Sequence, residues 1–247
     1  SRHPATLARA RRLKAIDRGT TDVQAGVQDA DLVVLATPVD VIVPYAKRLA
    51  RYMRPGSILT DVGSTKAGIV NALDHGLPDG VAFVGGDPLA GSEQQGIDAA
   101  TPRLFDGSSW VLTRTGRTDP RALRVLTACW EALGVDVLTM SPAQHDRVLA
   151  RVSHLPHAVA FCVLRSVTLA PLSQPPRSLR DMTRVAHSSP ELWDAIFLTN
   201  RTALLAAMGR FDQHWRALRA SLQRADRPMV RRWLRQAQAR RHARQIP

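Results

Sequence analysis

Two stretches of the sequence carry side chains that could do acid–base or hydrogen-bonding chemistry. The first, residues 83–93, follows an apolar segment, contains two adjacent glycines and a proline, and carries the carboxylates Asp87 and Glu93. A strand that runs into such a loop is where an open α/β sheet binds its ligand. Asp87 can accept a hydrogen bond from a ligand there. The alternative is an ordinary loop between a strand and a helix.

The second stretch holds Ser153, His154, Pro156 and His157 within five residues. Ser153 and His157 are four residues apart, so they share one face of a helix. Pro156 removes a backbone hydrogen bond and bends the helix, and perturbed titratable groups tend to mark functional sites. We therefore expect a binding or catalytic site here, with a satisfied structural histidine as the alternative.

Asp181 and Arg184 form a third candidate. Their spacing of three suits an ion pair on a helix surface, which contributes little to stability on its own. In the other interpretation, Arg184 clamps a substrate carboxylate through two parallel hydrogen bonds and Asp181 orients the guanidinium.

The elements that must position these residues alternate between strands and helices in the first half of the chain. Apolar runs typical of buried strands cover residues 31–37, 57–62, 81–84, 109–113 and 135–140. Helical spacing lies between them, for example over residues 39–52 and 120–133. This alternation predicts an α/β fold with a doubly wound parallel sheet.

Polar residues and a glycine follow the carboxyl ends of the first two strands, where the crevice of a parallel sheet forms. They are Thr37 and Pro38 after the first strand, and Asp61, Gly63, Ser64 and Lys66 around the end of the second. We expect this group to line a ligand-binding crevice, with Gly63 letting the backbone approach a ligand closely. Ser64 has two interpretations, a substrate contact or a plain helix N-cap.

After residue 140 the pattern becomes entirely helical. Ser141–Pro142 and Ser189–Pro190 are helix-start signals. Apolar residues then recur at alternating steps of four and three, which predicts a seam for another helix in the same chain or a partner. The seam consists of Leu204, Met208, Phe211, Trp215, Leu218 and Leu222. We expect a sheet domain over residues 1–140 and a helical domain over residues 141–247.

Composition limits the remaining classes. The chain has 247 residues, 45% hydrophobic and 22% charged, without a run of the roughly 18 apolar residues that a membrane span needs. Its two cysteines lie in helical patterns, which favours a reducing cytoplasmic compartment over a disulfide scaffold and supports no metal site. The net charge is +13, and the arginines are spread along the chain with one concentration in residues 227–244. We interpret that segment as a solvated basic helix, with an RNA-contacting arm or an anion-attracting face as alternatives.

A set of motifs in order along the whole chain resembles the prephenate/arogenate dehydrogenase family of tyrosine biosynthesis. The motifs are Asp61-Val-Gly-Ser-Thr-Lys66, Gly85-Gly-Asp-Pro-Leu-Ala-Gly-Ser-Glu93 with Gly96, Leu104-Phe105, His145-Asp146, Ser153-His-Leu-Pro-His157, and Asp181-Met-Thr-Arg184 with Trp193. The resemblance implies a Rossmann domain followed by a helical domain that dimerises. It also implies an NAD- or NADP-dependent oxidative decarboxylation of prephenate or arogenate.

The resemblance implies a role for most of the residues singled out above. Ser64 contacts the substrate near the nicotinamide and Glu93 supports the active site. Ser153, His154 and His157 face the substrate from the helical domain. Arg184 binds the substrate carboxylate, Asp181 holds Arg184, and Trp193 lies near the cleft. Thr37 and Pro38 line the cofactor groove, and Asp61, Gly63 and Lys66 are the other candidates for binding the cofactor.

The sequence departs from the family in two respects. The family begins with a strand, a Gly-x-Gly-x-x-Gly turn, a helix and a second strand, whereas this chain begins just after that unit, so we expect it to be a truncated form. The family motif Gly-Gly-His-Pro is Gly-Gly-Asp-Pro here, with Asp87 in place of the catalytic histidine. A carboxylate with an ordinary pKa near ~3.9 is a weak base at neutral pH, so we expect reduced or altered activity unless burial raises that pKa.

Two other functions stay open at this point. A non-catalytic dimeric relative that binds substrate or tyrosine in a regulatory role would explain both departures. A basic nucleic-acid-associated protein would explain only the charge and the C-terminal helix, and no pattern of interleaved aromatic side chains suggests a stacking platform.

Overall fold

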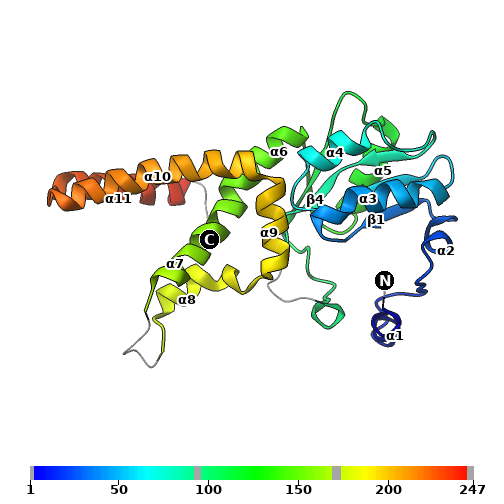
Figure 1. Ribbon diagram of the computed structural model, residues 1–247, viewed down its shortest axis with the longest axis horizontal. Coiled ribbons are helices and arrows are strands. Elements are labelled where there is room, and N and C mark those ends of the chain that lie inside the picture. Colours follow the sequence, from blue (N-terminus) through cyan, green and yellow to red (C-terminus); the bar gives the residue numbers. More distant parts are fainter. Residues whose placement is uncertain (1–2, 92–95, 169–173, 244–247) are drawn as a thin grey trace. The chain divides into compact units, whose positions relative to one another are not determined.

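The computed structural model describes residues 3–91, 96–168 and 174–243, which form two compact units, residues 1–201 and 202–247 (Figure 1). The two units are described separately. The first unit contains the sheets and the helices up to α9, and the second contains most of α10 and all of α11. The domain boundary expected at residue 140 stays a prediction.

Strands and helices alternate up to residue 140, as the hydrophobic pattern predicted. The strands are β1 (Leu32–Leu35), β2 (Ile58–Asp61), β3 (Ala82–Val84), β4 (Gly86–Pro88), β5 (Ser109–Thr113) and β6 (Asp136–Met140). The helices are α1 (Pro4–Arg12), α2 (Val23–Val27), α3 (Val39–Leu49), α4 (Ala67–Leu73) and α5 (Pro120–Glu131), with 3₁₀ turns at Ala50–Tyr52 and Ile97–Ala99.

Two three-stranded sheets result from this order. In the first, β1, β2 and β3 pair in parallel, with Leu32 opposite Ile58 and Ile58 opposite Ala82. In the second, β5 pairs in parallel with β6 and antiparallel with β4, where Asp87 lies opposite Val111. The predicted α/β class, with a parallel sheet followed by helices, is confirmed.

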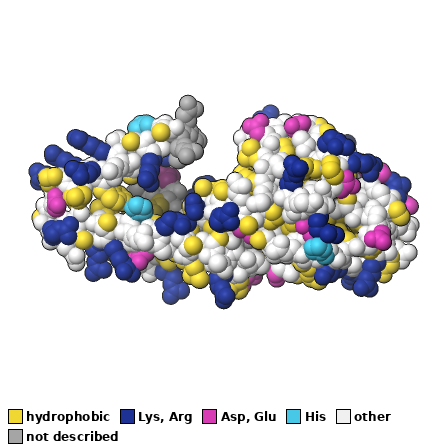
Figure 2. All heavy atoms as spheres, turned by 90° about the horizontal axis from the view of Figure 1, so that it is seen from above, with side chains coloured by type: hydrophobic (Ala, Val, Ile, Leu, Met, Phe, Trp, Pro, Cys, Tyr) yellow, Lys and Arg dark blue, Asp and Glu magenta, His cyan; other side chains and the backbone are white. Residues whose placement is uncertain are grey.

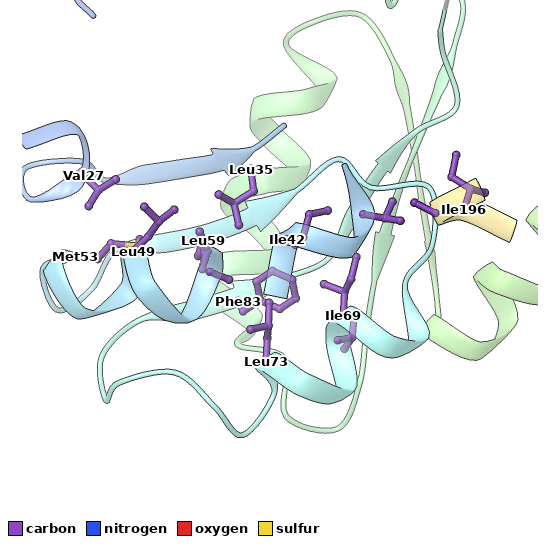
Figure 3. Packing of buried hydrophobic residues seen from close by; sticks show 14 of the residues in the cluster. Val27, Leu35, Ile42, Leu49, Met53, Leu59, Ile69, Leu73, Phe83 and Ile196 are labelled. Carbon is purple, nitrogen blue, oxygen red and sulfur yellow. The ribbon is translucent and has the colours of Figure 1, made fainter. Parts of the chain in front are cut away.

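Both faces of the strands are covered because successive side chains of a strand point in opposite directions. Leu59 and Phe83 pack with apolar residues of α3 and α4 in one cluster, which Figure 3 shows. Ile58 and Val84 pack on the other side, in the cluster that includes α5. This two-sided burial explains why the strand sequences are almost continuously apolar.

The segment at Gly85 and Gly86 differs from the expectation of a loop. The chain passes without a turn from β3 in one sheet to β4 in the other. A Cβ on Gly85 would lie 2.6 Å from Thr113 Oγ1, and a Cβ on Gly86 would lie 2.7 Å from the carbonyl oxygen of Asp61. Glycine is therefore required here for close packing, and Asp87 sits in a strand with only 4% of its surface exposed.

Helices follow β6, and no strand follows it in the part of the chain that the structure describes. They are α6 (Pro142–Leu149), α7 (Leu155–Ser166), α8 (Arg177–Thr183) and α9 (Pro190–Thr199), with a 3₁₀ turn at Arg184–His187. The predicted N-caps are present, since Ser141 Oγ accepts from the Gln144 N–H and Ser189 Oγ from that of Leu192. Between α6 and α7 lies a π-helical turn, Ala150–His154, which ends two residues before Pro156, a residue with no N–H to donate.

The second unit contains α10 (Arg201–Gln223), apart from its first residue, and α11 (Arg227–Ala243). Three members of the predicted seam, Phe211, Trp215 and Leu222, are exposed on α10. Lys and Arg side chains are spread over the face seen in Figure 2, with hydrophobic side chains among them. Among the described helices, none is long and apolar enough to cross a membrane.

Candidate active site

The carboxylate of Asp61 organises the loop at the carboxyl end of β2. Its Oδ2 accepts from the Gly63 N–H at 2.9 Å, and its Oδ1 accepts from the Gly86 N–H at 3.2 Å. The Lys66 ammonium donates to the same Oδ2, and both charged side chains are fully buried. A buried charge requires such pairing. The pair therefore holds this loop in place, and the expected role of Asp61 and Lys66 in binding a cofactor stays a prediction.

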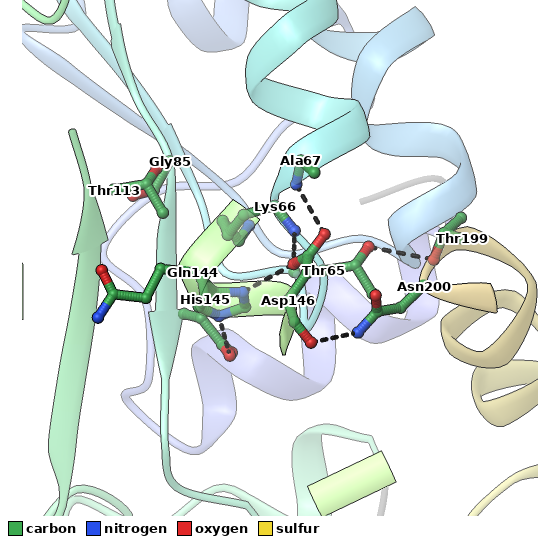
Figure 4. A network of polar contacts seen from close by, with 12 residues as sticks. Thr65, Lys66, Ala67, Gly85, Thr113, Gln144, His145, Asp146, Thr199 and Asn200 are labelled. Carbon is green, nitrogen blue, oxygen red and sulfur yellow. Dashed lines mark hydrogen bonds and ion pairs between the residues drawn. The ribbon is translucent and has the colours of Figure 1, made fainter. Parts of the chain in front are cut away.

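Asp146, from α6, binds the start of α4. Its Oδ1 accepts from the Lys66 N–H at 2.7 Å and its Oδ2 from the Ala67 N–H at 2.9 Å, as Figure 4 shows. These two N–H groups have no partner within the helix, so the carboxylate satisfies them. The neighbouring His145 hydrogen bond and these N–H bonds hold the pKa of Asp146 below its ordinary value, against the opposing effect of burial. The helical segment thus fixes the loop after β2.

His145 lies between two carboxylates. Its Nδ1 is 2.8 Å from Asp146 Oδ1, and its Nε2 is 2.9 Å from Asp87 Oδ2. Burial raises the pKa of Asp87, although His145 and Lys66 act against this increase. Burial would lower the pKa of His145, but its hydrogen bonds to Asp146 and Asp87 outweigh burial and raise it. Asp87, the residue at the family's histidine position, is therefore hydrogen-bonded to the imidazole of His145.

His154 is the next imidazole in this network and is also completely buried. Asn200 Nδ2 lies 3.1 Å from its Nδ1 and donates to the backbone carbonyl of Asp146 at 2.8 Å. Burial lowers the pKa of His154 to about 4, and the charge of Asp146 and the backbone of Ser64 offset only part of this effect. The ring is therefore neutral at physiological pH and close to the Ser64 backbone.

His157 is half-buried and stacks on Trp193, with ring centroids 3.6 Å apart. Its Nδ1 lies 2.9 Å from the backbone carbonyl of Ser153 and donates to it. Burial lowers the pKa of His157 and the positive charge of Arg184 lowers it further, while the Ser153 carbonyl acts in the other direction. The structure thus brings together His157, Trp193 and Arg184, as the resemblance implied, and places Ser153 beside them.

Asp181 and Arg184 line a groove of about 600 Å³ between α7, α8 and the turn after α8. Arg180 and His187 line the same groove. The ion pair recorded for Asp181 is with Arg177, four residues earlier, at 3.5 Å, and both side chains are largely exposed. The interpretation of Asp181 as the residue that holds Arg184 stays a prediction.

The expected cofactor groove at the end of β1 has one feature that fits a bound nucleotide. Thr37 Oγ1 is buried and has no hydrogen-bond partner among the described residues. A buried hydroxyl without a partner is costly, and a ligand at this sheet edge would satisfy it. Pro38 precedes α3 directly. Gly63 is needed for packing, since a Cβ there would lie 2.7 Å from Ile42 Cδ1.

The remaining predicted site residues have different outcomes. Glu93, and Ser92 beside it, lie outside the described residues. Ser64 is half-buried and is not the N-cap of α4, because Lys66 precedes that helix. Asn200 and the Thr65–Thr199 contact at 3.1 Å were missed. No sequence pattern marks them, whereas the adjacent His145 and Asp146 just after a helix start were visible as a pair.

Comparison with known proteins identifies the family. Residues 1–139 match the family model of the prephenate dehydrogenase nucleotide-binding domain, and residues 141–236 match that of the prephenate dehydrogenase dimerization domain. Cyclohexadienyl dehydrogenase of Zymomonas mobilis is 36% identical over 225 residues, which cover 88% of this chain and 76% of that protein. Prephenate dehydrogenase of Bacillus subtilis is 36% identical over 82% of this chain, which spans 56% of the relative.

Solved structures agree with these matches. The chain superposes with a TM-score of 0.90 and 33% identity on prephenate dehydrogenase from A. aeolicus in complex with hydroxyphenyl propionate and NAD⁺, covering 98% of this chain and 87% of the other. Arogenate dehydrogenase from Synechocystis gives a TM-score of 0.81 with 30% identity, covering 98% and 89% of the two chains. This chain belongs to the prephenate dehydrogenase family of oxidoreductases.

Proposed function

We propose that the protein catalyses the NAD(P)-dependent oxidative decarboxylation of prephenate or arogenate in tyrosine biosynthesis. In this reaction a hydride leaves the ring carbon that bears the hydroxyl, carbon dioxide leaves the opposite carbon, and the ring becomes aromatic. Membership of the family supports this proposal. The names of the relatives, which include cyclohexadienyl and arogenate dehydrogenases, support it as well.

One observation carries the proposal beyond family membership. Side chains from both matched segments meet at the loop after β2, where Asp146 accepts from the Lys66 N–H and His145 contacts Asp87. Asn200 donates to the backbone carbonyl of Asp146. This network connects the sheet edge to the segment that carries His154, His157 and Trp193. A site of this kind can hold a ring between a nucleotide-binding edge and a set of imidazoles.

The chain's own residues supply binding and orientation in this proposal. Arg184 lies near His157 and suits the substrate carboxylate through charge-assisted hydrogen bonds. Trp193 and His157 present stacked aromatic surfaces. Asp87 accepts a hydrogen bond from the ring hydroxyl, and the neutral His154 adds no charge to a site that must bind an anion. Ser64 and Ser153 keep their predicted roles as hydroxyl groups that contact the substrate.

In this proposal Thr37 and Pro38 hold the cofactor. The Thr37 hydroxyl, which has no hydrogen-bond partner among the described residues, would form a hydrogen bond with the bound nucleotide. NAD⁺ or NADP⁺, when bound, supplies the hydride acceptor. Glu93, outside the described residues, keeps its expected supporting role.

We also infer a cytoplasmic homodimer that forms through the helical residues of the dimerization-domain match. The exposed aromatic side chains of α10, Phe211 and Trp215, support this inference because they form an apolar surface on one helix. Burying such a surface against a second copy would remove it from water.

The test follows absorbance of NADH or NADPH when the purified protein is given prephenate or arogenate with each oxidised cofactor. We expect turnover with one substrate and one cofactor, and a KM for substrate raised roughly tenfold in Arg184→Gln with a smaller change in kcat. Asp79→Asn, on an exposed residue, is the matched control. Absence of turnover in all four combinations, with the protein folded, would contradict the proposal.

A further inference from the structure

Asp87, His145 and Asp146 lie in one hydrogen-bonded line. Both ring nitrogens of His145 are bonded to carboxylate oxygens, at 2.8 Å to Asp146 and 2.9 Å to Asp87. All three residues are at least nine-tenths buried. Within the described part of the chain, the second oxygen of Asp87, Oδ1, takes no hydrogen bond. One end of the line therefore keeps an acceptor for a ligand.

The line is rigidly held at both ends. Asp146 is fixed by two backbone N–H groups at the start of α4, and its carbonyl accepts from Asn200. Asp87 is fixed in β4 by pairing with β5. A side chain whose partners are all fixed is preorganised, so no rearrangement is needed when a proton moves.

We propose that Asp87 and His145 act as one proton-accepting pair for the ring hydroxyl of the substrate, with Asp87 touching the substrate and His145 acting through it. This inference rests on the proposed oxidative decarboxylation. As the hydride leaves, the hydroxyl O–H bond breaks and an O–H bond forms at Asp87 Oδ1. In the starting state of the pair Asp87 carries a proton on Oδ2 and His145 is neutral, and as Oδ1 takes the substrate proton the Oδ2 proton moves to His145 Nε2. After carbon dioxide leaves, both protons return and the product is a phenol, so the pair ends as it began.

The charges around the pair are consistent with this role. Asp146 lies on the far side of the imidazole and stabilises the imidazolium that forms. Lys66 opposes the burial effect on Asp87, while Asp61 adds to it. Burial raises the pKa of Asp87, so this carboxyl holds a proton more readily than an ordinary aspartate, and the two carboxylates raise the pKa of His145, so its ring accepts one more readily than an ordinary histidine. In this protein the imidazole thus acts through Asp87, one side chain further from the substrate than the histidine of the family.

The first test observes the proton on His145 directly by ¹⁵N NMR of the ring nitrogens. The ligands are 4-hydroxyphenylpyruvate and its 3,5-difluoro analogue, whose phenol is more acidic. In the wild type we expect the Nε2 signal of His145 to move towards the imidazolium position when the fluorinated ligand replaces the other. In Asp87→Asn the signal should not respond, and in Asp79→Asn it should respond as in the wild type. An Nε2 signal in the wild type that is insensitive to the ligand overturns the proposal, whether or not a variant folds.

The second test separates this proposal from the proposed function. Calorimetry measures binding of the same two ligands. If neither binds to the wild type, the proposed function fails and the pair fails with it. If both bind and the His145 signal does not depend on Asp87, only the pair is wrong.

A third measurement uses turnover. His145→Gln should lower kcat by about 100-fold with a KM within about threefold, because glutamine can bond Asp87 but cannot take a proton. In an Asp87→His background, the same His145→Gln change should lower kcat by no more than about threefold, since the new imidazole would accept the proton directly. Equal losses in the two backgrounds would overturn the proposal.

Discussion

Acid should destabilise the protein through His154 before it affects most carboxylates. The ring is completely buried in the π-helical turn, and Asn200 holds its Nδ1 at 3.1 Å. Burial lowers its pKa from 6.5 to about 4. A ring with a depressed pKa stabilises the fold above pH 6.5, where it is neutral in both states. That stability is lost as the pH falls towards 4, because the unfolded ring takes a proton that the folded ring refuses.

The size of the effect follows from the two pKa values. Between about pH 7.5 and about pH 5, the linkage relation gives a loss of about 2 kcal/mol from this group alone. Asp146 raises the pKa of His154, while His145 and His157 lower it. All three remain when His154 is replaced by glutamine. To a first approximation their contributions cancel in the comparison between the two proteins.

The assay is urea unfolding followed by circular dichroism at the two pH values, for the wild type and His154→Gln. We expect the variant to be less stable at the higher pH and to lose about 2 kcal/mol less than the wild type on acidification. His75→Gln, on an exposed residue, is the matched control and should lose as much as the wild type. Parallel losses in wild type and His154→Gln would refute the assignment of the acid sensitivity to this ring.

Two further substitutions test what holds the loop after β2. Lys66→Met leaves the fully buried Asp61 carboxylate without its cation and should lower the free energy of unfolding by about 3–5 kcal/mol, with a loss below about 1 kcal/mol contradicting the burial of the pair. Gly86→Ala places a Cβ 2.7 Å from the Asp61 carbonyl oxygen and should cost about 1–3 kcal/mol in urea unfolding. Gly116→Ala, where a Cβ would meet no atom within 4 Å, should change stability by less than about 0.5 kcal/mol; equal effects of the two glycine substitutions would argue against close packing at Gly86.

Sequence periodicity predicted the order of strands and helices because each strand is covered on both faces and each helix on one. It failed at Gly85 and Gly86 for a physical reason. Glycine ends an element when it supplies unusual dihedral angles, but it also permits two strands to cross closely, and only the neighbours distinguish the two cases. The local sequence does not reveal which residues pack against Gly85 and Gly86. The segment that forms β4 was therefore predicted to be a loop.

The polar residues of the site show a similar limit. Asp61 and Lys66 have the types and position of ligand-binding groups, yet each satisfies the other in the interior. The clustering of Ser153, His154 and His157 was visible because all three lie within five residues. The bond between Asp87 and His145 joins residues 58 positions apart, and no local pattern encodes it.

Helix α9 has a consequence for how proteins of this kind can be recombined. Trp193, Ala195 and Ile196 belong to the same apolar cluster as Leu59 and Phe83 of the sheet (Figure 3). A chimera joined at residue 140, with the two halves taken from different relatives, would therefore put a foreign helix into an inherited core. Only pairs of parents whose α3 and α9 surfaces have matching shapes should yield folded chimeras, so a crossover point chosen from family boundaries alone would be a poor guide.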